Sequence, residues 1–277
     1  MTGWVLGKSY DFRGQAVRYG VIGSGSPVVL VHGTPFSSYV WHRIAPHLAE
    51  RHEVFFFDLL GYGESEMRDG QDVSLGVQNE LLAELLGYWG LDRPDVVGHD
   101  FGGTTALRTH LLNGRDYRNL ILIDPVAFRP WGVGLDRAVR GHEGAFSSVS
   151  HEIHAAIVST YIRQAIRRTI PADELAPYLR PWLSDIGQSA FYRQMGQFDM
   201  RFTDEIEMRY HEVRCPTLIL WGEEDEWLPI EHGRRLKTLI PSADFRPVAE
   251  AGHLVQEDAP EAIVAALLDV LGDVRPG

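Results

Sequence analysis

The stretch Val96-Val97-Gly98-His99-Asp100-Phe101-Gly102-Gly103 is an apolar run that ends in glycines around one acidic residue. A short apolar run of this kind predicts a buried strand. Glycines at 98 and 102 leave room for a strand and the helix after it to approach each other across a sharp turn. The sequence therefore predicts a strand-to-helix turn with the carboxyl group of Asp100 at its tip. Two roles suit that group: a helix N-cap, for which aspartate is favoured, or a nucleophile.

Further apolar runs recur along the chain and alternate with helical patterns. They predict strands over residues 28–31, 54–57, 120–123 and 218–221. Runs that are apolar at every position are typical of strands covered on both faces, as in a parallel sheet. Apolar residues at helical spacing predict helices over 77–89 and 263–271. The alternation predicts an α/β fold built on a doubly wound, mostly parallel sheet.

The strand pattern lapses between Phe128 and Val213, and resumes at Thr217. The intervening residues show helical patterning broken by prolines. An insertion between two strands of one sheet is expected to lie over the carboxyl ends of the strands, as a lid. We therefore expect a core domain over 1–127 and 214–277, and a helical cap subdomain over 128–213.

Composition narrows the classes of partner. The chain has 277 residues, 44% of them hydrophobic and 23% charged, as in a soluble globular protein. Its formal net charge of -12 disfavours binding to nucleic acid or to anionic membranes. The N-terminal residues lack the pattern of a signal peptide, and no apolar stretch approaches the roughly 20 residues of a membrane span. We expect a cytoplasmic protein with a small-molecule substrate, and a buried structural role for the single cysteine, Cys215.

Four separated segments together resemble the α/β-hydrolase superfamily. VHGTP at 31–35 matches the oxyanion loop, DLLGYGES at 58–65 a turn of the family, and GHDFGG at 98–103 the nucleophile elbow. WGEEDEWLP at 221–229 and AEAGHLVQEDAPE at 249–261 match the acid and histidine segments. The order of nucleophile, acid and histidine along the chain is that of the family. The resemblance covers most of the chain outside the expected cap, and it implies an α/β-hydrolase fold with an inserted helical cap.

The resemblance also implies a catalytic set. Asp100 corresponds to the nucleophile, His253 to the base and Asp225 to the acid that orients the base. Asp124 follows the preceding strand, at an acid position used by a subset of dehalogenases. The backbone N–H groups of Thr34 and Phe101 would form the oxyanion hole.

Aspartate in the elbow changes the chemistry that a serine would support. A carboxylate is already charged at neutral pH, so it can attack saturated carbon without a base and form an alkyl-enzyme ester. The histidine is then left to activate the water that hydrolyses the ester. Epoxide hydrolases and haloalkane dehalogenases of the family follow this two-step logic.

The residues leave these two subclasses open. Epoxide hydrolases of the family use lid tyrosines as acids, and Tyr161 and Tyr192 lie roughly where that pair lies. Dehalogenases hold the halide with N–H donors, for which the indoles of Trp131 and Trp182 are candidates. Phe101 stands where these enzymes typically carry tryptophan.

We therefore expect a cofactor-independent hydrolase that resembles an epoxide hydrolase acting on small apolar substrates. A haloalkane dehalogenase is the alternative, and a non-catalytic ligand-binding member of the superfamily is a further alternative. No metal is expected, because the histidines at 151 and 154 are one residue closer than in H-E-x-x-H. The sequence indicates neither the leaving group, nor the cap residues that line the pocket, nor the oligomeric state.

Overall fold

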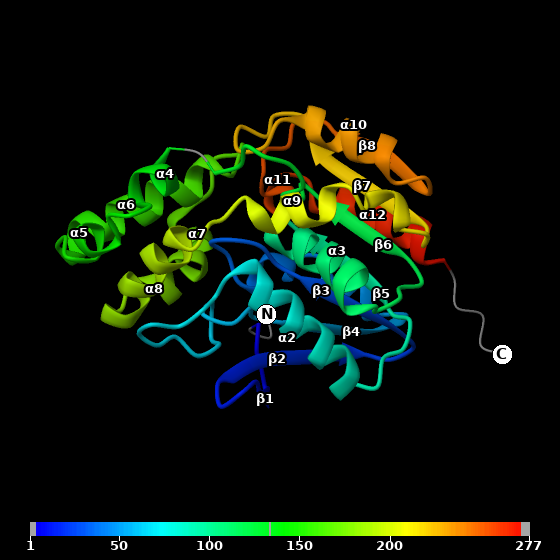
Figure 1. Ribbon diagram of the computed structural model, residues 1–277, viewed down its shortest axis with the longest axis horizontal. Coiled ribbons are helices and arrows are strands. Elements are labelled where there is room, and N and C mark those ends of the chain that lie inside the picture. Colours follow the sequence, from blue (N-terminus) through cyan, green and yellow to red (C-terminus); the bar gives the residue numbers. More distant parts are fainter. Residues whose placement is uncertain (1–3, 133, 273–277) are drawn as a thin grey trace.

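A computed structural model describes residues 4–132 and 134–272 (Figure 1). An eight-stranded sheet runs in the order β1-β2-β4-β3-β5-β6-β7-β8. The pairs β1–β2 and β2–β4 are antiparallel. All the other pairs are parallel. The strands are β1 Lys8–Asp11, β2 Ala16–Gly23, β3 Ser26–Val31, β4 His52–Phe57, β5 Asp95–His99, β6 Leu120–Ile123, β7 Thr217–Gly222 and β8 Ala243–Val248. The expected α/β-hydrolase fold is confirmed.

Every apolar run in the sequence became a central strand of the sheet. β5 and β6 are buried along their whole length, as expected for strands that helices cover on both faces. Three strands lacked a sequence signal. β1, β2 and β8 carry exposed residues among buried ones, so no continuous apolar run marks them.

Helices pack on both faces of the sheet. Figure 1 shows α2 and α3 in front of the sheet and α12 behind it. The helices of the core are α1 Ala45–Leu48, α2 Leu75–Tyr88, α3 Phe101–Asn113, α10 Ile230–Leu239, α11 Val255–Asp258 and α12 Pro260–Leu271, with a short 3-10 turn η1 at Ser38–Trp41. In the part of the chain that the structure describes, no helix is both long and apolar enough to cross a membrane.

Between β6 and β7, the described residues form helices and loops but no strand. We call residues 128–213 the cap segment; α4 to α8 of this segment lie to one side of the sheet in Figure 1. Its helices are α4 Leu135–Val139, α5 Glu143–Ser147, α6 His151–Gln164, α7 Ala172–Leu179, α8 Asp185–Gly196 and α9 Arg201–Glu207, with 3-10 turns η2 Arg180–Trp182 and η3 Tyr210–Glu212. That the cap segment is a separate subdomain stays a prediction.

The turn between β5 and α3 consists of Asp100 alone. Its φ angle is 52°, a left-handed value that is uncommon for a residue other than glycine. A Cβ atom on Gly102 would lie 2.1 Å from the Val31 carbonyl oxygen, and one on Gly98 would lie 2.6 Å from the Gly102 oxygen. The two glycines are therefore required for strand and helix to meet this closely, as the sequence predicted.

Candidate active site

The Asp100 carboxylate is held by a neighbouring loop. Its Oδ1 accepts a hydrogen bond from the backbone N–H of Thr34 at 2.7 Å. Its side chain makes no capping bond to α3. The N-cap alternative is therefore not realised, and the carboxylate faces the loop that carries Thr34.

Three side chains from separate loops meet here. His253 lies between β8 and α11, and its Nε2 is 3.4 Å from Asp100 Oδ2. Its Nδ1 donates to Asp225 Oδ2 at 2.9 Å. The second oxygen of Asp225 accepts from the N–H groups of Trp227 and Leu228, which fixes the carboxylate. The carboxyl ends of parallel strands share one edge of a sheet, and this edge brings the three residues together.

The two carboxylates control the charge of His253. Burial lowers the pKa of this imidazole, but Asp225 and Asp100 outweigh burial and raise the pKa well above its ordinary value. In the resting protein the two carboxylates therefore favour the protonated imidazole. Any step that neutralises Asp100 removes part of this support, and it lowers the pKa of His253.

Asp124, the alternative acid, has different partners. Its Oδ1 accepts from the N–H of Gly222 at 2.9 Å, and its buried Oδ2 has no hydrogen-bond partner among the described residues. Burial, and next the charge of Asp225, raise the pKa of Asp124 well above its ordinary value. Burial and Asp225 thus favour the protonated form of Asp124, and His253 bonds Asp225 instead.

The two candidate tyrosines of the cap segment face different ways. Tyr161, on α6, lines the small cavity beside Asp100, and its ring packs on Trp227 with centroids 4.6 Å apart. Tyr192, on α8, shares a hydrogen bond of 3.0 Å with Nδ1 of His154. Among the described residues that line the cavity, Tyr192 is absent. The structure brings Tyr161 to the site and does not bring Tyr192.

Gln194, for which the sequence indicated no role, contacts the loop of Thr34 from α8, the helix that also carries Tyr192. Gln194 Oε1 accepts from the hydroxyls of Thr34 and Tyr62, the latter at 3.0 Å. Residues two apart on a helix point about 200° away from each other, so Gln194 faces the core where Tyr192 faces α6. The helical period alone shows that only one of the two could face the site, but it does not show which.

The sequence indicated no role for His99 or Trp227, and both contact His253. His99 Nε2 is 2.9 Å from the backbone oxygen of His253. A carbonyl oxygen only accepts, so His99 carries its proton on Nε2, and burial lowers its pKa well below the ordinary value. The indole of Trp227 stacks on the His253 ring with centroids 4.9 Å apart. These contacts fix the backbone and the ring plane of His253.

The two indoles considered as halide donors already have acceptors. Trp131 Nε1 donates to Thr203 Oγ1 at 3.1 Å. Trp182 Nε1 donates to the Pro35 backbone oxygen at 2.8 Å. A halide at either donor would have to displace an existing hydrogen bond.

The remaining sequence expectations concern metals and the cysteine. Cys215 is buried, as expected. His151 lies 3.2 Å from Asp185, whereas His154 bonds Tyr192 and the Trp182 backbone oxygen. Within the described ranges, no three His, Cys, Asp or Glu side chains are grouped so that they could hold a metal ion.

Comparisons with known proteins agree with this architecture. A family model described as "Alpha/beta hydrolase family" matches residues 28–266. An alpha/beta hydrolase fold protein from Burkholderia ambifaria is 50% identical, with a TM-score of 0.94 over 96% of this chain and 98% of that one. A 2-hydroxy-6-oxo-2,4-heptadienoate hydrolase from Pseudomonas putida is 29% identical over 90% of each chain. Haloalkane dehalogenase 2 from Mycobacterium tuberculosis is 25% identical over 95% of this chain and 94% of its own. The chain belongs to the alpha/beta hydrolase family.

Proposed function

We propose that this protein is an epoxide hydrolase that forms an alkyl-enzyme ester on Asp100. The observation that carries the proposal is the placing of His253 between Asp100 and Asp225. A serine nucleophile needs this histidine to remove its proton, whereas a carboxylate does not. The arrangement therefore fits a nucleophile that attacks first and a base that acts second.

In the first step, Asp100 attacks a carbon of the epoxide with Oδ2, because Thr34 holds Oδ1. The new carbon–oxygen bond forms as the ring carbon–oxygen bond breaks, and the departing oxygen takes the proton of the Tyr161 hydroxyl. Tyr161 is then an anion beside the cationic His253. Asp100 is now an uncharged ester, so the pKa of His253 falls. His253 gives up its Nε2 proton, which restores the Tyr161 hydroxyl.

In the second step, neutral His253 takes a proton from water, and the resulting hydroxide attacks the ester carbonyl carbon. The N–H groups of Thr34 and Phe101 stabilise the oxyanion. As the intermediate collapses, the diol leaves with the proton from His253. The remaining proton of the Asp100 carboxyl passes to His253, and the resting charges return.

The choice of epoxide over halide follows from the donors. Tyr161 lines the cavity beside Asp100, whereas both candidate indoles of the cap segment already donate to protein acceptors. The similarity to a haloalkane dehalogenase keeps that activity as the second candidate.

The test uses the variant His253→Gln, which should attack substrate but not hydrolyse the ester. Incubation with a small epoxide such as propylene oxide should add the mass of one epoxide, and peptide mapping should place it on Asp100. Asp100→Asn is the control and should gain no mass. Diol formation by the wild-type protein then supports the epoxide hydrolase, and halide release from haloalkanes supports the dehalogenase. Ligand binding without adduct or turnover would support the non-catalytic alternative.

A further inference from the structure

The cavity beside Asp100 is too small for the substrate that its chemistry needs. Its free volume is about 30 Å³. A single water needs roughly 10–15 Å³ on this measure, so the cavity holds one or two waters. An organic substrate must therefore gain space from a neighbouring part of the protein.

Phe198 lines both this small cavity and a much larger one. Its ring packs on Phe101 and Trp131, with centroid distances of 4.9 Å and 5.4 Å. Phe198 lies in the short connection between α8 and α9, outside either helix.

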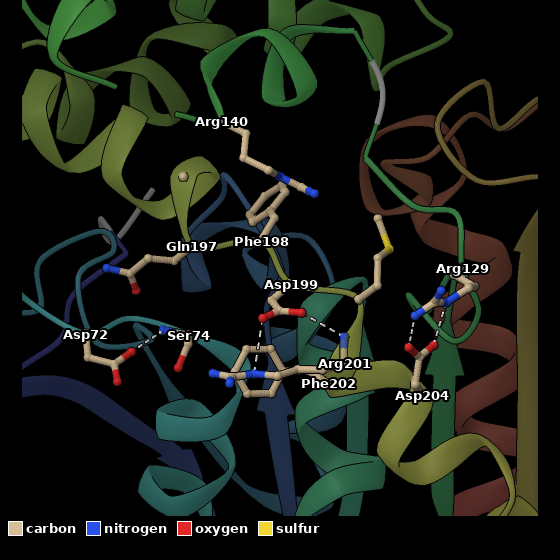
Figure 2. Close-up of a pocket in the computed structure, with 12 residues that line it drawn as sticks. Asp72, Ser74, Arg129, Arg140, Gln197, Phe198, Asp199, Arg201, Phe202 and Asp204 are labelled. Carbon is tan, nitrogen blue, oxygen red and sulfur yellow. Dashed lines mark hydrogen bonds and ion pairs between the residues drawn. The ribbon is translucent and has the colours of Figure 1, made fainter. Parts of the chain in front are cut away.

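The larger cavity has the size of a ligand site. Its volume is about 640 Å³, within the range of small-molecule pockets. Figure 2 shows its wall, which combines residues of the cap segment with Asp72 and Ser74 from the core. Asp72 is engaged locally, because its Oδ1 accepts from the N–H of Ser74 at 3.0 Å.

One cation of this cavity is uncommitted. Arg129 bonds Asp204, and Arg201 Nε lies 3.2 Å from Asp199. In the described ranges, the Arg140 guanidinium has no carboxylate within ion-pair distance. Burial raises the pKa of Asp136, and the charge of Arg140 acts on that carboxyl from farther away and offsets part of the rise. Figure 2 shows the Arg140 side chain extending toward the Phe198 ring. The Arg140 guanidinium and the Phe198 ring thus face the same cavity.

We propose that the larger cavity is the second part of the substrate site, that Phe198 turns aside to join it to the catalytic cavity, and that Arg140 binds a carboxylate on the substrate. The substrate class is then a short aliphatic epoxide that carries a carboxylate at its far end. A guanidinium binds a planar carboxylate through two parallel N–H bonds. This proposal deepens the proposed function and rests on it for the position of the electrophilic carbon; carboxylate binding at Arg140 is testable without turnover.

Calorimetry tests the anion site directly. Butanoate, hexanoate and octanoate are each compared with their primary amides on the wild-type protein and on Arg140→Gln. Charge-assisted hydrogen bonds should make a carboxylate bind about 10- to 100-fold tighter than its amide, and Arg140→Gln should abolish this preference. Arg201→Gln is the matched control, because that guanidinium is already paired, and it should keep the preference. Equal binding of hexanoate and hexanamide to the wild-type protein, or a preference that survives in Arg140→Gln, would overturn the proposal.

Covalent labelling tests the joining of the cavities. In the His253→Gln background, the terminal epoxide of hexenoate is compared with propylene oxide, which carries no carboxylate and needs less added space. Phe198→Leu should accelerate labelling of Asp100 by the longer epoxide more than by propylene oxide, and a uniform effect or none would refute the role of Phe198. Absence of labelling by every epoxide would refute the proposed function instead, and the calorimetry would still decide the anion site.

Discussion

Replacement of Asp225 by asparagine should affect the two steps of the proposed mechanism differently. The change removes a charge but keeps the size of the side chain. Asp225 Oδ2 lies 2.9 Å from His253 Nδ1, and both side chains are 0% exposed. A charge pair about 4 Å apart at an effective dielectric constant near 20 is worth about 4 kcal/mol. That energy corresponds to a factor of about a thousand in rate.

We expect this factor in hydrolysis of the ester, where His253 becomes a cation as it takes a proton from water. Formation of the ester should be far less affected, because Asp100 needs no base. Rapid-quench mass spectrometry measures both rates, since the ester adds the mass of the substrate. Asp225→Asn should therefore accumulate ester that the wild-type protein does not.

Asp124→Asn is the matched control at the alternative acid position. Asp124 makes no hydrogen bond to His253 and its pKa is raised by burial and by Asp225, so asparagine should leave ester hydrolysis close to the wild-type rate. The reasoning fails if Asp124→Asn accumulates ester and Asp225→Asn does not. That result would make Asp124 the partner of the base.

Three further predictions concern the pH dependence of stability, the acid and the elbow. The raised pKa of His253 gives a stabilisation that is fully present below the unfolded pKa of about 6.5 and is lost as pH rises through the higher folded pKa. Urea unfolding should therefore show the wild-type protein losing stability relative to His253→Gln as pH rises above about 6.5; parallel curves would contradict this. Tyr161→Phe should slow labelling of Asp100 about 100-fold or more, whereas Tyr192→Phe, which lies off the cavity, should label at nearly the normal rate. Gly102→Ala should lower the free energy of unfolding by about 1–3 kcal/mol, because its Cβ meets backbone at 2.1 Å, whereas Gly144→Ala, with open space around it, should not be destabilising. Equal behaviour within either pair of variants would show that the stated contact does not matter.

The sequence predicted those parts of the site that depend on local chemistry. The glycines at 98 and 102 predicted the sharp turn at Asp100, because no side chain fits there. Asp225 and His253 were expected only from the resemblance to the α/β-hydrolase superfamily, because β8, the strand before His253, carries no continuous apolar run.

The sequence could not predict which faces of the cap helices turn toward the core. Tyr192 and Gln194 lie on opposite sides of α8, and only the packing of α8 against the oxyanion loop decides between them. The indoles of Trp131 and Trp182 donate hydrogen bonds to Thr203 and to the Pro35 backbone. These acceptors are distant in sequence, so no local pattern reveals them.

The bonds from the cap segment to the oxyanion loop limit how substrate can enter. The Trp182 indole donates to the Pro35 backbone oxygen, and the Thr34 hydroxyl donates to Gln194. The cap segment is therefore hydrogen-bonded to both Thr34 and Pro35. Displacement of the whole cap segment would shift Thr34, whose backbone N–H holds Asp100, the proposed nucleophile. Entry past Phe198, as proposed above, would leave the Thr34 N–H in place. Asp100 and His253 would then stay together while ligands enter and leave.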